Sequence, residues 1–174
     1  MRETILVATV GLILTSTASA QSITWDYDRL TDFSRMKTYT WAAGTELEDQ
    51  LNHKRIIAAV DAQLAAHGLA RVESAGTGPD LLVAYHATFD RNVRINAYST
   101  GFAYRFVGSR STTANVEEIL KGTLIVDLID ARTKTIVWRG IASKEIDVRA
   151  DPAKRDRNIN RAAEKLFNRY PPAK

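Results

Sequence analysis

The chain of 174 residues contains no cysteine, only four prolines and few aromatic residues (8%). The lack of cysteine excludes a disulfide scaffold, a thiolate zinc site, a thiol nucleophile and a lipid anchor attached to cysteine. The net charge of +4 is a mild basic excess and not the concentrated charge of a nucleic-acid-binding protein. With 45% hydrophobic and 25% charged residues, the composition is typical of one folded domain.

An apolar run at residues 5–14 follows Arg2 and precedes the small residues Ala18-Ser19-Ala20. These are the parts of a secretory signal peptide, and the run is too short for a spanning helix, which needs about 20 apolar residues. We therefore predict cleavage after Ala20 and a mature single domain of residues 21–174 in the periplasm. Because Gln21 and not a cysteine follows the cleavage site, we expect no lipid anchor and no transmembrane segment after cleavage.

Hydrophobic periodicity indicates an α+β fold in the mature chain. Two amphipathic helices are predicted at 45–67 and 151–170, and residues 92–98 are read as the return arm of a hairpin. The predicted strands lie at 22–28, 36–41, 70–73, 80–91, 122–130 and 135–146. The order of these elements favours a two-layer sandwich, with a mostly antiparallel sheet and both helices on one face.

Local signals predict where these helices begin and end. Thr45 and Glu48 have the spacing of a capping box, and Gly68 is suited to the left-handed stop of the first helix. Asp151 followed by Pro152 is an N-cap with proline at the first helical position.

Four stretches carry a resemblance to a known family. They are DFSRMKTYTW at 32–41, PDLLVAY at 79–85, GTLIVDLID at 122–130 with VWRG at 137–140, and LFNRYPP at 166–172. Together they resemble domain of unknown function 4136, a family of bacterial envelope proteins that are often lipoproteins. The resemblance implies a secreted α+β domain, although this chain lacks the lipid-accepting cysteine. It supplies no catalytic residues.

No chemical motif of an enzyme is present. The three histidines, His53, His67 and His86, do not have metal-ligand spacing, and neither a nucleophile elbow nor a phosphate-binding loop occurs. We therefore predict no catalytic residue, no metal site and no cofactor, and expect His86 to be a half-buried histidine with a backbone partner. Asp127 lies inside an apolar strand and is expected to pair with Arg139 if the hairpin register places both on one face. The alternative is a small periplasmic hydrolase that uses acidic residues and His86.

Two features suit binding. Residues 98–115 carry Tyr98, Phe102, Tyr104 and Phe106 among small polar residues, a composition common in recognition loops, although the same rings suit packing on a sheet. The last helix carries Arg157, Arg161, Lys165 and Arg169 at four-residue spacing, which is either a basic ridge for an anionic surface or a solvated face.

The resulting hypothesis is a non-enzymatic envelope protein that acts as a binding or scaffolding module. The expected partner is an unidentified envelope protein or an anionic membrane surface, and not nucleic acid. The sequence leaves the oligomeric state open.

Overall fold

The computed structural model describes residues 21–45, 47–73, 78–98 and 113–172. In these ranges six strands form one sheet in the order β1-β6-β5-β4-β2-β3. The sheet is mixed, because β2 runs parallel to β3 and β4 while the other neighbours are antiparallel. The elements are β1 Ser22–Tyr27, the short 3-10 helix η1 Phe33–Arg35, β2 Thr38–Trp41, α1 Gln50–Ala66, β3 Ala70–Arg71, β4 Leu81–Tyr98, β5 Thr113–Asp130, β6 Ile136–Glu145 and α2 Pro152–Phe167. The α+β class and the mostly antiparallel sheet are confirmed.

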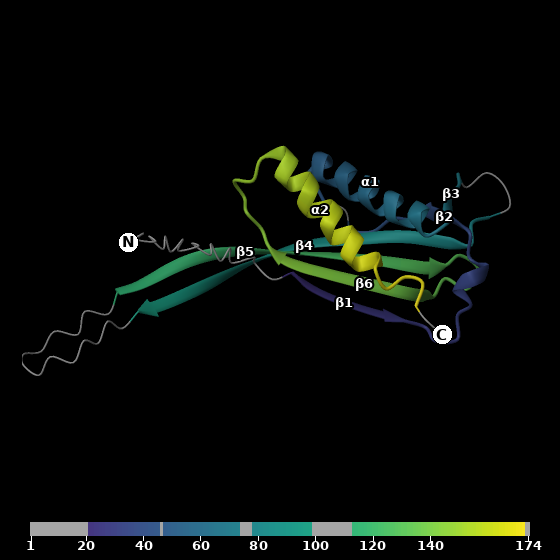
Figure 1. The fold of residues 1–174 in the computed structure, drawn as a ribbon, viewed down its shortest axis with the longest axis horizontal. Helices are drawn as coiled ribbons and strands as arrows, with labels where there is room; N and C mark the ends of the chain where they lie inside the picture. The colour runs from purple at the N-terminus through teal and green to yellow at the C-terminus, as the bar shows by residue number, and fades with distance from the viewer. Residues whose placement is uncertain (1–20, 46, 74–77, 99–112, 173–174) are drawn as a thin grey trace, which may run out of the picture.

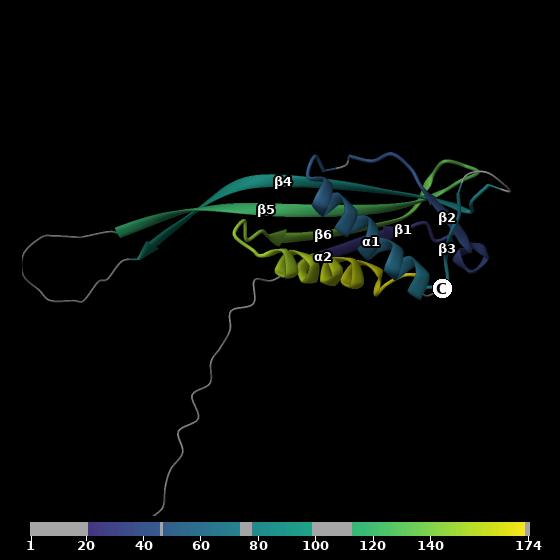
Figure 2. The same ribbon diagram turned by 90° about the horizontal axis from the view of Figure 1, so that it is seen from above.

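Strands β4 and β5 are the longest elements and pair along their whole length, from Leu81 opposite Asp130 to Tyr98 opposite Thr113. Beyond the helices they continue as a two-stranded ribbon (Figures 1 and 2). The prediction that 92–98 is a return arm was therefore wrong, as was the start of the following strand at 122.

The ends of both helices have identifiable caps. Asp49 starts α1, since its carboxylate accepts the amides of Leu51 at 3.0 Å and Asn52 at 3.2 Å. The capping box predicted at Thr45 was wrong, because Thr45 forms a β-bridge with His86 and its backbone is extended there. The left-handed stop at Gly68 (φ 81°) and the Asp151 cap of α2 are confirmed.

The core lies between the helices and the sheet. Helices α1 and α2 lie side by side and contact each other, and α2 also contacts β1 and β6 (Figures 1 and 2). The indole of Trp138 stacks on Phe167 with ring centroids 5.1 Å apart. The most deeply buried apolar residues come from both helices and from alternate positions of the strands: Val60, Leu64, Leu166, Phe167, Leu81, Val83, Val126, Leu128 and Trp138.

Gly140 allows this close packing of α2 on β6. A Cβ at this position would lie 2.5 Å from the Trp138 ring and 2.9 Å from a Leu166 methyl group. Both neighbours are buried, so neither has open space to move into. Glycine is therefore required at position 140 because Trp138 and Leu166 approach its Cα closely, and not because of its backbone angles.

Candidate functional site

An apolar groove opens where α1 and α2 begin. Its floor is formed by β4, β5 and β6, its walls by the first turns of both helices, and its volume is about 380 Å³. This volume falls in the range of roughly 300–1,000 Å³ that is usual for small-molecule sites. The lining residues are Gln21, Leu47, Asn52, Ile56, Ala87, Phe89, Leu120, Gly122, Thr123, Leu124, Ala142, Lys144, Glu145, Ile146, Asp147, Val148, Arg155, Asn158, Ile159 and Ala162.

Large apolar side chains at the rim of the groove are accessible to water. The exposed fractions are 51% for Phe89, 39% for Ile146 and 62% for Val148. Ile146 lies directly over Gly122, where a Cβ would approach its side chain to 2.8 Å. Exposed apolar side chains gathered in one place are typical of an interaction site.

Polar side chains also line the groove, and several of them are held by specific partners. The Lys144 ammonium donates to the Asn158 amide oxygen at 3.2 Å. Arg155 donates to the backbone carbonyls of Ala150 and Val148. Asp147 forms an ion pair of 2.7 Å with Lys154, whose hydrogen bond is the main cause of the lowered pKa of that carboxyl group. Lys144 and Arg155 thus contact neutral oxygens, whereas the Asp147 charge is already compensated.

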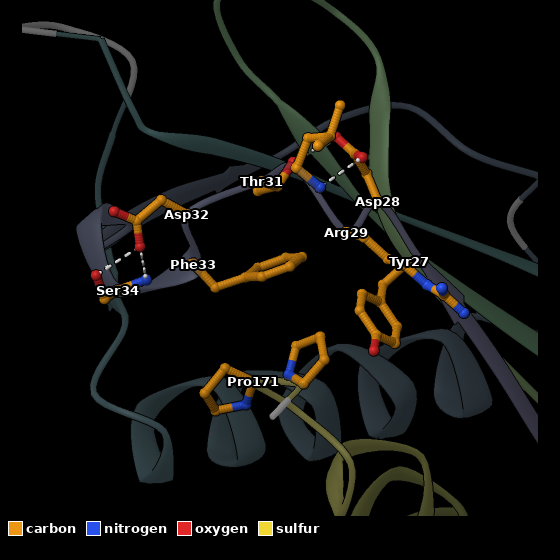
Figure 3. A pocket seen from close by; sticks show the side chains of 10 residues that line it. Tyr27, Asp28, Arg29, Thr31, Asp32, Phe33, Ser34 and Pro171 are labelled. Carbon is orange, nitrogen blue, oxygen red and sulfur yellow. Dashed lines mark hydrogen bonds between the residues drawn. The ribbon is translucent and has the colours of Figure 1, made fainter. Parts of the chain in front are cut away.

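A second cavity, the Phe33 pocket, lies at the opposite end of the sheet and has a volume of about 800 Å³. Figure 3 shows its walls, with Tyr27, Phe33 and Pro171 around the opening. Asp28 accepts the Leu30 amide and the Thr31 hydroxyl, and the first of these bonds is the main cause of its lowered pKa. This carboxylate is therefore held within its own turn.

The predicted pair of Asp127 and Arg139 is confirmed. Both oxygens of the buried Asp127 carboxylate accept hydrogen bonds from Arg139, at 2.6 and 2.7 Å. This bond is also the main cause of the raised pKa of Arg139. A carboxylate held on both oxygens has a structural role.

His86 lies next to this pair. Its Nε2 is 3.6 Å from Asp127, and its Nδ1 accepts the backbone N–H of Thr45 at 3.0 Å. The expected backbone partner of His86 is therefore confirmed. The hydrolase alternative used acidic residues and His86, and the structure places one acidic residue, Asp127, beside His86. Neither residue lines the groove or the Phe33 pocket.

The predicted binding residues that the structure describes do not line the groove. Tyr98 ends β4, and the predictions for Phe102, Tyr104 and Phe106 concern positions outside the described residues. On α2, Arg157 and Arg161 are exposed and Lys165 is half-buried. The Arg169 guanidinium lies 4.7 Å above the Trp25 ring in a cation–π contact, so this member of the row has a structural partner.

Sequence analysis missed the groove itself. Phe89 lies on the same strand face as Val83 and Tyr85. The signal for the groove was therefore an apolar residue that continues this face farther along the strand.

Within the described ranges, no three His, Asp or Glu side chains gather in a way that suits a metal ion. In the same ranges, no helix has the length and hydropathy needed to cross a membrane.

Residues 23–172 match the family model described as Domain of unknown function (DUF4136). No curated protein matches the chain. The fold is similar to a PDZ domain protein from Parabacteroides distasonis, with a TM-score of 0.57 and 16% identity over 90% of this chain but only 38% of that one. It is also similar to PelC from Paraburkholderia phytofirmans, a dodecamer, with a TM-score of 0.52 and 11% identity over 85% of this chain and 95% of that one. At such identities the likeness concerns the fold alone.

Proposed function

The chain belongs to the DUF4136 family, and on that premise we propose that it is a non-enzymatic binding or scaffolding module of the bacterial envelope. The apolar groove is the observation that supports this proposal. Water-exposed Phe89, Ile146 and Val148 beside a cavity are costly to maintain unless another apolar group covers them.

The proposed architecture is a two-layer sandwich in which both helices cover one face of the sheet. The groove is then the open end of the space between the layers. The similar fold of PelC occurs in a dodecamer, which supports the use of this fold in assemblies. Scaffolding in a larger complex is therefore part of the proposal.

The proposed location is the periplasm, after removal of residues 1–20 as a signal peptide and without a lipid anchor. Intact mass of the protein recovered from the envelope fraction tests this part. A mass that starts at Gln21 supports it, whereas a chain that retains residues 1–20 in the inner membrane contradicts it.

The groove is tested with the uncharged apolar dye N-phenyl-1-naphthylamine, whose fluorescence rises in an apolar site. Ile146→Ser should weaken dye binding about tenfold, since the apolar surface that this substitution removes is worth roughly 1.4 kcal/mol. Ile136→Ser is the matched control, because Ile136 is the same residue type with similar exposure (46% against 39%) and lies at the other end of the groove-floor strand β6. Equal effects of the two variants would contradict the groove as the site.

A second contact surface is proposed at Tyr98, Phe102, Tyr104 and Phe106, together with the basic residues Arg157, Arg161, Lys165 and Arg169 on and just after α2. Crosslinking in intact cells followed by affinity recovery tests the rings. Phe102→Ala and Tyr104→Ala should lower partner recovery and leave the melting temperature unchanged. A sharp fall in melting temperature in both variants would instead assign the rings to packing.

A further inference from the structure

We propose that the groove binds the hydrocarbon chain of a single-chain anionic amphiphile, whose carboxylate or phosphate head group is held by Lys144. This inference rests on the proposed function and names the class of ligand that the groove takes. The head group belongs to an individual molecule that enters the groove, and not to a bilayer surface.

The charges of the groove favour an anion. Lys144 contacts only the neutral Asn158 oxygen, at a relatively long 3.2 Å, and Arg155 contacts only backbone carbonyls among the described residues. The Asp147 carboxylate is neutralised by Lys154. Glu145 also lines the groove, but it follows Lys144 in β6, so its side chain leaves the strand on the opposite face. A ligand carboxylate or phosphate would give Lys144 a charge-assisted hydrogen bond that it does not make with the described part of the chain.

The floor of the groove favours a hydrocarbon chain over a peptide. Phe89, Gly122 and Lys144 occupy one row across β4, β5 and β6, and these strands are hydrogen-bonded to one another there. In a sheet the backbone N–H and C=O groups point sideways, toward the neighbouring strands, and not out of the face that forms the floor of the groove. A bound peptide would bury its own amides without partners, which is unfavourable, whereas a hydrocarbon chain has no polar groups to satisfy.

The shape of the site favours one chain over a membrane surface. The groove has a floor of three strands and walls from two helices, so an apolar chain can lie between the walls. A bilayer would instead meet the exposed cations Arg157 and Arg161, which do not line the groove. Binding of an individual amphiphile in the groove would therefore depend on Lys144, whereas binding to a bilayer surface would depend on Arg157 and Arg161.

The experiment uses the exported protein, the bound dye and three competitors at about pH 8, where a carboxyl group is ionised. Dodecanoate and dodecanol share one chain and differ in head-group charge, and acetate has the charge without the chain. Both twelve-carbon ligands are used below the concentrations at which they aggregate. We expect dodecanoate to displace the dye about tenfold more tightly than dodecanol, and acetate not to displace it.

Lys144→Gln should abolish the preference for dodecanoate over dodecanol, and Lys144→Arg should retain it. Lys54→Gln is the matched control, because Lys54 is an exposed lysine of α1 that does not line the groove. Normal dye binding by Lys144→Gln would show that this variant is folded.

Equal displacement by dodecanoate and dodecanol, with dye binding intact, would overturn this inference and leave the proposed function standing. Loss of the preference in Lys54→Gln as well as in Lys144→Gln would also overturn it. Dye binding that is equally weak in the wild type and in Ile146→Ser would refute the proposed function. Binding to phosphatidylglycerol vesicles that requires Arg157 and Arg161, without dodecanoate binding, would assign the anion preference to a membrane surface.

Discussion

Replacing Arg139 by methionine should destabilise the domain by about 3 kcal/mol. Asp127 retains only 2% side-chain exposure, and Arg139 supplies both of its short charge-assisted hydrogen bonds. Removing one partner of a buried ion pair costs about 3–5 kcal/mol, because the other charge is left uncompensated. The Arg139 side chain is 41% exposed, so water can enter the vacated space and the lower end of that range applies. His86 is too distant, at 3.6 Å, to replace the two missing bonds.

Urea unfolding followed by tryptophan fluorescence measures this loss, which corresponds to a fall of about 6–12 °C in melting temperature for a domain of this size. The double variant Asp127→Leu/Arg139→Met is the control, since it removes the buried charge together with its partner and should recover most of the stability. A single variant within about 1 kcal/mol of wild type would refute the reasoning. So would a double variant no more stable than the single one.

Two further predictions concern packing and pH. Gly140→Ala should lower the free energy of unfolding by about 1–3 kcal/mol, because the added Cβ overpacks against Trp138 and Leu166. Gly78→Ala is the control and should be near neutral, because no atom lies within 4 Å of the added Cβ. Thermal melts of both variants measure the difference. Asp80→Ala should cost about 1 kcal/mol at neutral pH, because this carboxylate accepts both backbone amides of Lys37 and Thr38 and joins β2 to β4. The Lys37 amide is the main cause of the lowered pKa of Asp80, so the stability difference from wild type should be full above the ordinary value of 3.8 and should vanish as pH falls through the lowered pKa. A difference that persists in strong acid would contradict this assignment.

The pairing of Asp127 with Arg139 could be proposed from sequence because both residues lie in one hairpin. Two alternating strands joined by residues 131–134 leave few possible registers, and side chains in the correct one share a face. The turn is held by Asp130, which accepts the amides of Arg132 and Thr133, and Lys134 adopts a positive φ of 61°. The register shifts by one residue between Leu128 and Ile129, and this irregularity places Asp127 opposite Arg139. Turn chemistry and strand alternation alone therefore do not fix the pair.

The start of α1 was not predictable in the same way. Thr45 and Glu48 form a valid capping pattern locally, but the Thr45 amide donates to His86, which is 41 residues away in the chain. This contact extends the backbone at Thr45 along β4, and Asp49 then caps the helix. A contact between distant segments therefore overrides a local signal, and one sequence contains no trace of it.

The groove escaped prediction for a related reason. A helix that began at residue 45 would be about 7 Å longer than α1, at 1.5 Å per residue. Its additional turn would lie near Phe89 and Ile146. With α1 starting at Gln50, these apolar side chains remain accessible, and Leu47 lines the groove from an extended segment. The site thus depends on an element boundary, which is the least certain part of a reading from sequence.

The residues that stabilise the core and the residues that line the groove lie near opposite ends of α2. Trp138, Phe167 and Tyr170 pack as a ring cluster with centroid distances of 5.1–6.0 Å at the C-terminal end of α2. The groove is lined by Arg155, Asn158 and Ile159 near the other end, about 12 Å away along the helix if Ile159 and Phe167 are compared. Because the ring cluster anchors α2, the space beside its first turns can stay open without loss of the fold. Substitutions at Gly140 should therefore change stability, and those at Ile146 should change ligand binding, each with little effect on the other property.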